Sequence, residues 1–383
     1  MEEGIRAYMR NVIGQQEYGK SNRSRVFQTI YAAKTISKQE IADKLQLSMP
    51  TVTQYLRELY AAGIIYKNGY YQSTGGRKAQ AISVAALSVV AIGVELLRES
   101  IKISAVDLCG NVIREEFYIV PFSNNEAYYK HFGELVNAFA DKLDTPEAHL
   151  LGVAIAVQGL VSKDGTVIVN GDILGYTGTT IDVFQRHINL PCHMFHDTEV
   201  AAFAELWDLP EIKDAVYIAL NRNLGGAVIV NGQMFHGREF NGCIIEHMRL
   251  VPNGTKCYCG RRGCFEAYCS VASLEAETGM DTATFFKRLK DGDARCEGIF
   301  DQYLSYLALA INNIRMLIDC DFILGGFLDP YLMDQHIEML AEKVRKESSF
   351  ESTGFSFRRS RHGASAASRG AALLEIDAFI ASV

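Results

Sequence analysis

The chain has 383 residues, of which 48% are hydrophobic and 22% are charged. This composition excludes a chain that is disordered throughout, and it supplies apolar residues for two or three domain cores. No apolar run approaches the ~20 residues that cross a bilayer, and the first residues lack the pattern of a secretory signal. We therefore expect a cytoplasmic protein without a membrane anchor. Nine cysteines are too few for a disulfide scaffold.

The net charge of −7 is unevenly distributed along the chain. Residues 1–80 contain 12 Lys and Arg against 6 Asp and Glu, a net charge of +6, and the remainder carries −13. A small basic module joined to a large acidic body is typical of a nucleic-acid-binding head on an effector domain. Chance clustering of surface lysines is the alternative that charge alone leaves open.

Helix-start signals organise the basic N-terminal module. Apolar residues at helical spacing predict a first helix over residues 24–34. Ser37 and Glu40 form a capping box, which predicts a second helix that ends at Leu45. Ser48 is expected to cap a third helix. Three helices in this order, with short breaks between them, indicate a helix-turn-helix arrangement.

A hairpin is expected to follow the third helix. The segments Ile64–Tyr66 and Tyr70–Gln72 have strand character, and they flank Asn68 and Gly69. An Asn-Gly pair favours a tight turn, because both residues tolerate positive φ. Three helices and a hairpin form a winged helix-turn-helix, so we predict a DNA-binding domain over residues 1–80. A helical subdomain without a nucleic-acid role stays as the alternative.

The third helix is expected to enter the major groove of DNA. Its polar face gives the candidate DNA contacts, and a further candidate lies after two glycines of the following segment. They are Thr51, Thr53, Gln54, Arg57 and Arg77. Arg77 is the residue expected in a narrow minor groove, where the negative potential is enhanced. An ordinary Gly-rich linker is the alternative for its segment.

Long β-branched runs alternate with helical segments in the rest of the chain. Strand-like runs at 88–97, 101–108 and 111–120 precede a helix near 125–143 and a strand from residue 150. A second set follows, with strands near 215–220, 225–232 and 322–326 and a long helix near 300–318. The order strand, strand, strand, helix, strand thus recurs. This pattern predicts a duplicated α/β architecture.

One histidine and three cysteines have the spacing of a metal site. The motif is His-x9-Cys-x-Cys-Gly-x3-Cys, formed by His247, Cys257, Cys259 and Cys264. Gly260 and Gly263 can provide the turns that bring the thiolates together. Four ligands of this kind, with no open position, indicate a tetrahedral structural Zn²⁺. Buried free thiols are the alternative.

These features together resemble the ROK family, which comprises repressors, open reading frames and kinases. The winged head joined through Gly-Gly-Arg to such a body is similar to the repressor branch, which includes xylose and N-acetylglucosamine repressors. The resemblance implies that residues 85–383 form a duplicated RNase H-like domain of the actin/hexokinase type. It also implies that this domain senses an effector and oligomerises, and that it carries zinc at the cysteine motif.

The phosphate-binding loop of the family's kinases is altered here. That loop reads approximately Gly-Ile-Asp-Ile-Gly-Gly-Thr-Lys, and the matching segment begins at Gly93. Leu97 and Arg98 replace the two loop glycines, and Glu99 replaces the threonine. Without glycine the backbone N–H groups cannot close on phosphate oxygens, and Glu99 would repel them. We expect no ATP binding and no catalysis, although Asp197 matches the family's catalytic base.

The resemblance also implies a set of effector contacts. Ile244 replaces a glutamate that binds sugar in the family, which indicates a remodelled pocket. The candidate ligand-binding residues are Asp172, His196, Asp197, His247 and Glu266. A helix cap or salt bridge is the alternative for Asp197 and Glu266.

The sequence as a whole predicts a sugar-responsive repressor that binds operator DNA as a homodimer or homotetramer. Twofold symmetry would then require operators with inverted repeats. Two alternatives remain. The effector could be a protein partner docking on a body with a vestigial sugar pocket, or the chain could be a sugar kinase, which would need the intact phosphate loop.

Overall fold

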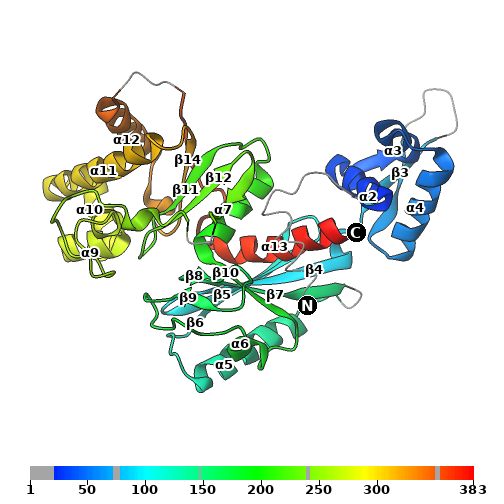
Figure 1. The fold of residues 1–383 in the computed structure, drawn as a ribbon, viewed down its shortest axis with the longest axis horizontal. Helices are drawn as coiled ribbons and strands as arrows, with labels where there is room; N and C mark the ends of the chain where they lie inside the picture. The colour runs from blue at the N-terminus through cyan, green and yellow to red at the C-terminus, as the bar shows by residue number, and fades with distance from the viewer. Residues whose placement is uncertain (1–20, 72–77, 146–147, 239–241, 350–353) are drawn as a thin grey trace. The chain divides into compact units, whose positions relative to one another are not determined.

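The computed structural model describes residues 21–71, 78–145, 148–238, 242–349 and 354–383 (Figure 1). The chain forms two compact units. One comprises Met1–Asp197 with Ser368–Val383, and the other comprises Thr198–Ala367. The chain passes between the units within two helices, α7 (Asp197–Asp208) and α13 (Ala366–Ser382).

The three helices predicted for the head are confirmed. They are α2 (Asn22–Ala33), α3 (Lys38–Leu45) and α4 (Met49–Ala61). Ser37 caps α3, and the reciprocal bond from its backbone N–H to the Glu40 carboxylate completes the predicted capping box. Ser48 caps α4 through the backbone N–H of Thr51. Local side-chain chemistry therefore sets where these helices begin.

The predicted Asn-Gly turn in the head is wrong. Strand β2 (Ile65–Tyr70) continues through Asn68 and Gly69 and pairs with β3 (Gln80–Val84), whereas Gln72 lies outside the described residues. The register shifts between Lys67 and Tyr70, and Gly69 has a φ of 75°. Gly69 thus lies at an irregularity of the ladder, and its positive φ is the conformation that glycine adopts in a G1 bulge. β1 (Thr35–Ser37) completes a sheet of order β1-β3-β2.

The body part of the first unit is built on a five-stranded sheet of order β10-β7-β4-β5-β6. Its strands are β4 (Val89–Leu96), β5 (Ser100–Asp107), β6 (Val112–Ile119), β7 (His149–Val157) and β10 (Cys192–His196). The first three are antiparallel, and β7 and β10 join in parallel. A short hairpin of β8 (Leu160–Val161) and β9 (Ile168–Asn170) lies between β7 and β10 in the chain.

Helices cover both faces of this sheet (Figure 1). On one face, aromatic residues of α5 (Glu126–Asp141) and α6 (Asp182–Gln185) pack into the main core, among them Phe132 and Phe184. On the other face lies α13. A Cβ at Gly93 of β4 would overlap the Ser368 carbonyl oxygen, so glycine permits this close approach.

The second unit repeats the sheet of the first. Its order is β13-β12-β11-β14-β15, with three antiparallel strands followed by two parallel ones. The strands are β11 (Ala215–Ala219), β12 (Gly225–Val230), β13 (Gln233–Phe235), β14 (Asp321–Gly325) and β15 (Phe357–Arg359). The identical strand order confirms the predicted duplication and the RNase H-like architecture.

Helices inserted before β14 and β15 form the large core of the second unit with the sheet. They are α8 (Glu266–Cys269), α9 (Val271–Thr278), α10 (Thr282–Lys290), α11 (Ala294–Arg315) and α12 (Asp334–Glu347). Short 3-10 turns η2 (Ile245–His247) and η3 (Asp329–Tyr331) join the sheet to these helices. None of the described helices is both long enough and apolar enough to cross a membrane.

Candidate functional site

Helix α4 presents a polar face to solvent. Val52, Leu56 and Leu59 are buried in the head, whereas Gln54 and Arg57 are exposed. The spacing of the three apolar residues fixes this orientation, because they lie on one side of the helix. The predicted third helix is therefore oriented as a recognition helix requires.

The polar side chains of α4 differ in the hydrogen bonds that they make within the head. The hydroxyl of Thr53 donates to the Met49 carbonyl oxygen at 2.6 Å, and that of Thr51 lies 2.7 Å from the Ser48 hydroxyl. Gln54 donates to Glu58 at 3.2 Å. Within the described residues, the Arg57 guanidinium makes no such bond. Arg77 lies outside the described residues.

Sequence reasoning missed the exposed side chains of the wing. β2 exposes Tyr66 and Tyr70, at 46% and 65% of their surface, and Lys67 between them. Amphipathic aromatic rings and a cation on a wing strand are suited to contacts with a nucleic-acid backbone. The sequence could have indicated this exposure, because Lys67 and Asn68 within the same strand are residue types that face solvent.

The four predicted metal ligands lie together in the second unit. One ligand atom from each of His247, Cys257, Cys259 and Cys264 lies within 4.8 Å of every other. Two pairs approach more closely, with Cys257 Sγ 3.7 Å from His247 Nδ1 and Cys259 Sγ 3.8 Å from Cys264 Sγ. A tetrahedron with Zn–S bonds of ~2.3 Å has sulfur–sulfur edges of about 3.8 Å. The donor set and its spacing therefore fit one tetrahedral ion.

Two glycines shape the loop that carries the thiolates. Gly260 and Gly263 have φ values of 81° and 82°, so each occupies the left-handed region that favours glycine. The backbone N–H of Cys257 donates to Arg261 at 2.8 Å, which closes the turn. A Cβ at Gly263 would overlap the carbonyl oxygen of Val251. The loop geometry is thus built into the sequence of the motif.

Glu266 follows the last thiolate and is bonded within its own unit. Its carboxylate accepts bonds from the Asn223 side chain at 2.9 Å and the Leu224 backbone N–H at 2.6 Å. Burial raises the pKa of Glu266, and these two donors partly offset the rise. The carboxylate therefore ties α8 to residues 223–224. The contact is neither a helix cap nor a salt bridge, the two alternatives that the sequence left open, because its donors are an amide and a backbone N–H just before β12.

The remaining candidate ligand residues belong to the first unit. Asp197, at the start of α7, is 9% exposed, and its carboxylate lies 3.4 Å from His196 Nε2. Asp172 is exposed, and it accepts a bond from the Thr177 hydroxyl at 3.3 Å. The five predicted residues thus divide between the units, with Asp172, His196 and Asp197 in the first and His247 and Glu266 in the second.

A buried carboxyl that sequence reasoning missed lies on β4. Burial, together with the Asp197 and Glu115 charges, raises the pKa of Glu95 to about 8, although Lys102 opposes the shift. Glu95 is therefore a largely protonated acid at neutral pH. The sequence could have indicated this buried carboxyl, because Glu95 is an acidic residue inside the apolar run at 88–97.

The segment aligned with the kinase phosphate loop forms the turn between β4 and β5. Leu97 N–H donates to the Ser100 carbonyl at 3.0 Å, and the side chains of Arg98 and Glu99 are exposed. The carbonyl oxygens of Arg98 and Glu99 accept bonds from the backbone N–H groups of residues 122 and 120, at 2.7 and 3.1 Å. The turn is thus held as a tight hairpin that displays a carboxylate.

Two family models match separate parts of the chain. A model of the ROK family matches residues 91–378, and a model of winged helix-turn-helix DNA-binding domains matches residues 21–66. The N-acetylglucosamine repressor of Escherichia coli O6:H1 is 28% identical over 257 residues, which cover 66% of this chain and 63% of that protein. The xylose repressor of Caldicellulosiruptor bescii is 25% identical over 350 residues, with coverage of 85% and 88%.

Solved structures share the fold at low sequence identity. A ROK family transcriptional regulator, described as a homologue of the E. coli MLC protein, has a TM-score of 0.78 at 19% identity, covering 94% of this chain and 96% of that one. A ROK family glucokinase from Streptomyces griseus, in complex with glucose and AMPPNP, has a TM-score of 0.67 at 20% identity, with coverage of 74% and 98%. With the family model matching three quarters of its length, the chain belongs to the ROK family and carries an N-terminal winged helix-turn-helix domain.

Proposed function

We propose that this protein is a transcriptional regulator that represses genes of carbohydrate metabolism. In this proposal residues 1–80 bind operator DNA, and residues 85–383 sense a small carbohydrate and oligomerise. The observation that carries it is the exposed polar face of α4 in a winged head that is joined to a ROK body. The repressors among its relatives support the same function. We propose a cytoplasmic location for the protein, on the sequence prediction.

The proposed reading of DNA assigns different roles to the polar residues of α4. Gln54 and Arg57 are exposed and can reach base edges, whereas Thr51 and Thr53 are suited to phosphates. Arg77 is proposed for the minor groove on the sequence argument alone. A homodimer or homotetramer would place two heads on half-sites about one helical turn, or a multiple of it, apart.

Arg57→Ala is expected to weaken operator binding, because an arginine bonded to a base or phosphate contributes about 1–3 kcal/mol. A gel-shift titration of the full chain at fixed salt measures this, with Arg295→Ala, an exposed arginine of α11, as the matched control. A loss of affinity for only one of two operator sequences indicates a base contact, and an equal loss of affinity for both indicates a phosphate contact. Equal affinity of the Arg57 variant and the wild type would contradict the proposed contact between Arg57 and DNA.

A structural Zn²⁺ is proposed at His247, Cys257, Cys259 and Cys264. The 3.7 and 3.8 Å spacings among the donors support it. When bound, the ion supplies a cross-link between the chain near η2 and the loop before α8. His247 lies three residues after Ile244, and Glu266 lies two residues after Cys264. The bound ion would therefore also fix these two segments, to which the resemblance assigns effector contacts.

We propose that the body senses its effector without phosphorylating it. Asp172, His196, Asp197, His247 and Glu266 are the proposed effector contacts, on the resemblance to the family. The tight turn at 97–100, with an exposed Glu99 and no glycine, supports the loss of nucleotide binding.

Calorimetry of the full chain with Mg-ATP is accordingly expected to give no measurable heat of binding, and an assay of ATP with hexoses is expected to give no transfer. The E. coli N-acetylglucosamine repressor is a suitable comparison protein, and the S. griseus glucokinase is the positive control. Micromolar affinity for Mg-ATP would instead support the kinase alternative, whatever the role of Asp197.

A further inference from the structure

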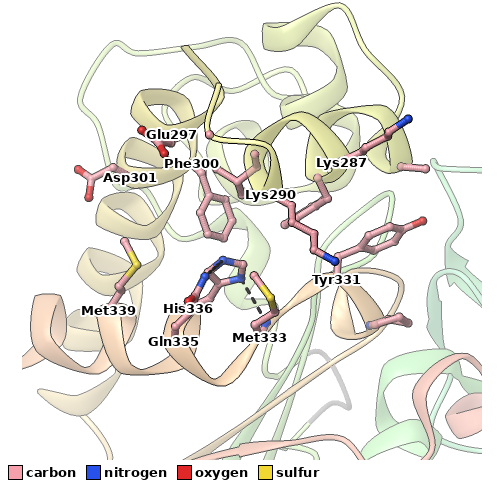
Figure 2. Close-up of a pocket in the computed structure, with 15 residues that line it drawn as sticks. Lys287, Lys290, Glu297, Phe300, Asp301, Tyr331, Met333, Gln335, His336 and Met339 are labelled. Carbon is pink, nitrogen blue, oxygen red and sulfur yellow. Dashed lines mark hydrogen bonds between the residues drawn. The ribbon is translucent and has the colours of Figure 1, made fainter. Parts of the chain in front are cut away.

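A cavity of about 840 Å³ lies among the helices of the second unit (Figure 2). Its walls come from α10, the first turns of α11, the η3 segment and the first half of α12. All of its lining residues belong to the second unit, and none of them is a predicted DNA, metal or carbohydrate contact. The volume lies within the range of small-molecule sites.

The inner wall of the cavity is aromatic. Phe286 and Phe300 are buried, and Tyr331 stacks on Phe286 with ring centroids 5.1 Å apart. His336 lies edge-on to Phe300, at 4.8 Å. Met333, at the opening, is 39% exposed, and its thioether can adapt to different shapes. This surface is suited to a flat or irregular apolar body.

Two polar side chains of α12, the buried His336 and the exposed Gln335, lie together on one side of the cavity. His336 Nδ1 accepts the Met333 backbone N–H at 3.2 Å, so the proton of the neutral ring is on Nε2. Burial lowers the pKa of His336, which keeps the ring neutral at pH 7. The Gln335 amide lies 3.5 Å from Nε2. Because Nε2 carries the proton, the amide oxygen of Gln335 faces the ring and accepts from Nε2–H, which leaves the amide N–H₂ of Gln335 to donate elsewhere.

One lysine adds a positive charge to the opening. Figure 2 shows the Lys290 side chain extending between Tyr331 and Met333, with its ammonium beside Tyr331, whereas the Lys287 ammonium points away. Both lysines lie in the last turn of α10, where cations stabilise the helix dipole. The helix dipole explains why lysines occur in this turn, but it does not explain the direction in which the Lys290 side chain points.

The opposite wall does not cancel this charge. Asp301 lies on α11, but its carboxylate pairs with Lys343 at 2.7 Å. Glu297 is exposed to solvent in the first turn of the same helix. In the part of the chain that the structure describes, Lys290 forms no ion pair with either carboxylate. Its ammonium is therefore available to an anion.

We propose that this cavity binds a small organic anion with an apolar or aromatic body. The body would lie against Phe286 and Tyr331, and the carboxylate, sulfonate or phosphate group would pair with the Lys290 ammonium. The site goes beyond the proposed carbohydrate sensing, since it uses a different part of the second unit. It assigns the chain a second ligand of different chemistry.

A fluorescence titration with 8-anilinonaphthalene-1-sulfonate tests the proposal on the full chain. The wild type is expected to bind the probe saturably. Lys290→Ala is expected to weaken binding roughly tenfold, the loss typical of a hydrogen bond to a charged group. Lys287→Ala removes the same charge from the same turn and should stay within about twofold. The uncharged analogue N-phenyl-1-naphthylamine should be insensitive to both changes.

Met339→Trp provides a second test that does not depend on charge. Met339 lines the opening and is 39% exposed, so a larger side chain there can narrow the opening without disturbing the core. This variant is expected to bind the probe more weakly while it keeps the thermal stability of the wild type. Equal binding by the two lysine variants, or full binding by Met339→Trp, would overturn the proposal.

Discussion

Cys259→Ser is expected to leave the protein without bound zinc and to unfold the segment from residue 247 to residue 264. Structural zinc contributes on the order of 10 kcal/mol in small domains, and a serine hydroxyl is a poor substitute for a thiolate. Without the thiolate of Cys259, the ion no longer holds residue 259 within 3.8 Å of the Cys264 sulfur. Metal analysis, limited proteolysis and a fall in Tm of roughly 10 °C should report the change.

Cys109→Ser is the matched control, because Cys109 is an exposed cysteine of the first unit and lies outside the cluster. It should keep about one zinc per chain and the Tm of the wild type. The Cys259 variant should still bind operator DNA, since the head contains none of the four ligands. Wild-type protein purified without chelators that contains no zinc, or a Cys259 variant with a full complement, would contradict the metal assignment.

Glu95→Gln is expected to stabilise the protein in alkaline but not in acidic solution. The native carboxyl holds its proton up to about pH 8, whereas the unfolded chain loses it near pH 4.5. Between these values the native state binds more protons, so the free energy of unfolding falls as the pH rises. Glutamine mimics the protonated form and removes this loss. At pH 8.5 the variant should melt roughly 5 °C or more above the wild type.

Thermal melts at pH 5 and pH 8.5 measure this difference. Glu99→Gln makes the same substitution at an exposed carboxyl in the turn next to β4 and should melt like the wild type at both values. If Glu95→Gln shifts Tm by the same amount at both pH values, the carboxyl is not a buried acid with a raised pKa. The effect then comes from packing.

Features that depend on neighbouring residues could be predicted from the sequence. Ser37 with Glu40 and Ser48 satisfy backbone N–H groups a few residues away, so the starts of α3 and α4 follow from local chemistry. The metal cluster is similar, because Gly260 and Gly263 permit the turns that bring its thiolates together. The repeated succession of strands and helices along the chain could also be predicted, because buried strands have sequences of consecutive β-branched residues.

Features that depend on distant residues could not be predicted in the same way. Asn68 and Gly69 suit a turn and a bulge equally, and the pairing of β2 with Gln80–Val84 decided between them. The bonds from residues 223 and 224 to Glu266 join positions more than 40 residues apart. The cavity lined by Lys290 and His336 likewise forms only where α10 meets α12.

The account's central claim is that a sugar-responsive body controls DNA binding by the head. Selection of the full chain on a random DNA library, followed by gel shifts with monosaccharides and their phosphates, tests it most directly. We expect enrichment of an inverted repeat, affinity that falls steeply with salt, and release by one carbohydrate. Failure to enrich any sequence, or operator binding that no carbohydrate changes, would contradict the claim.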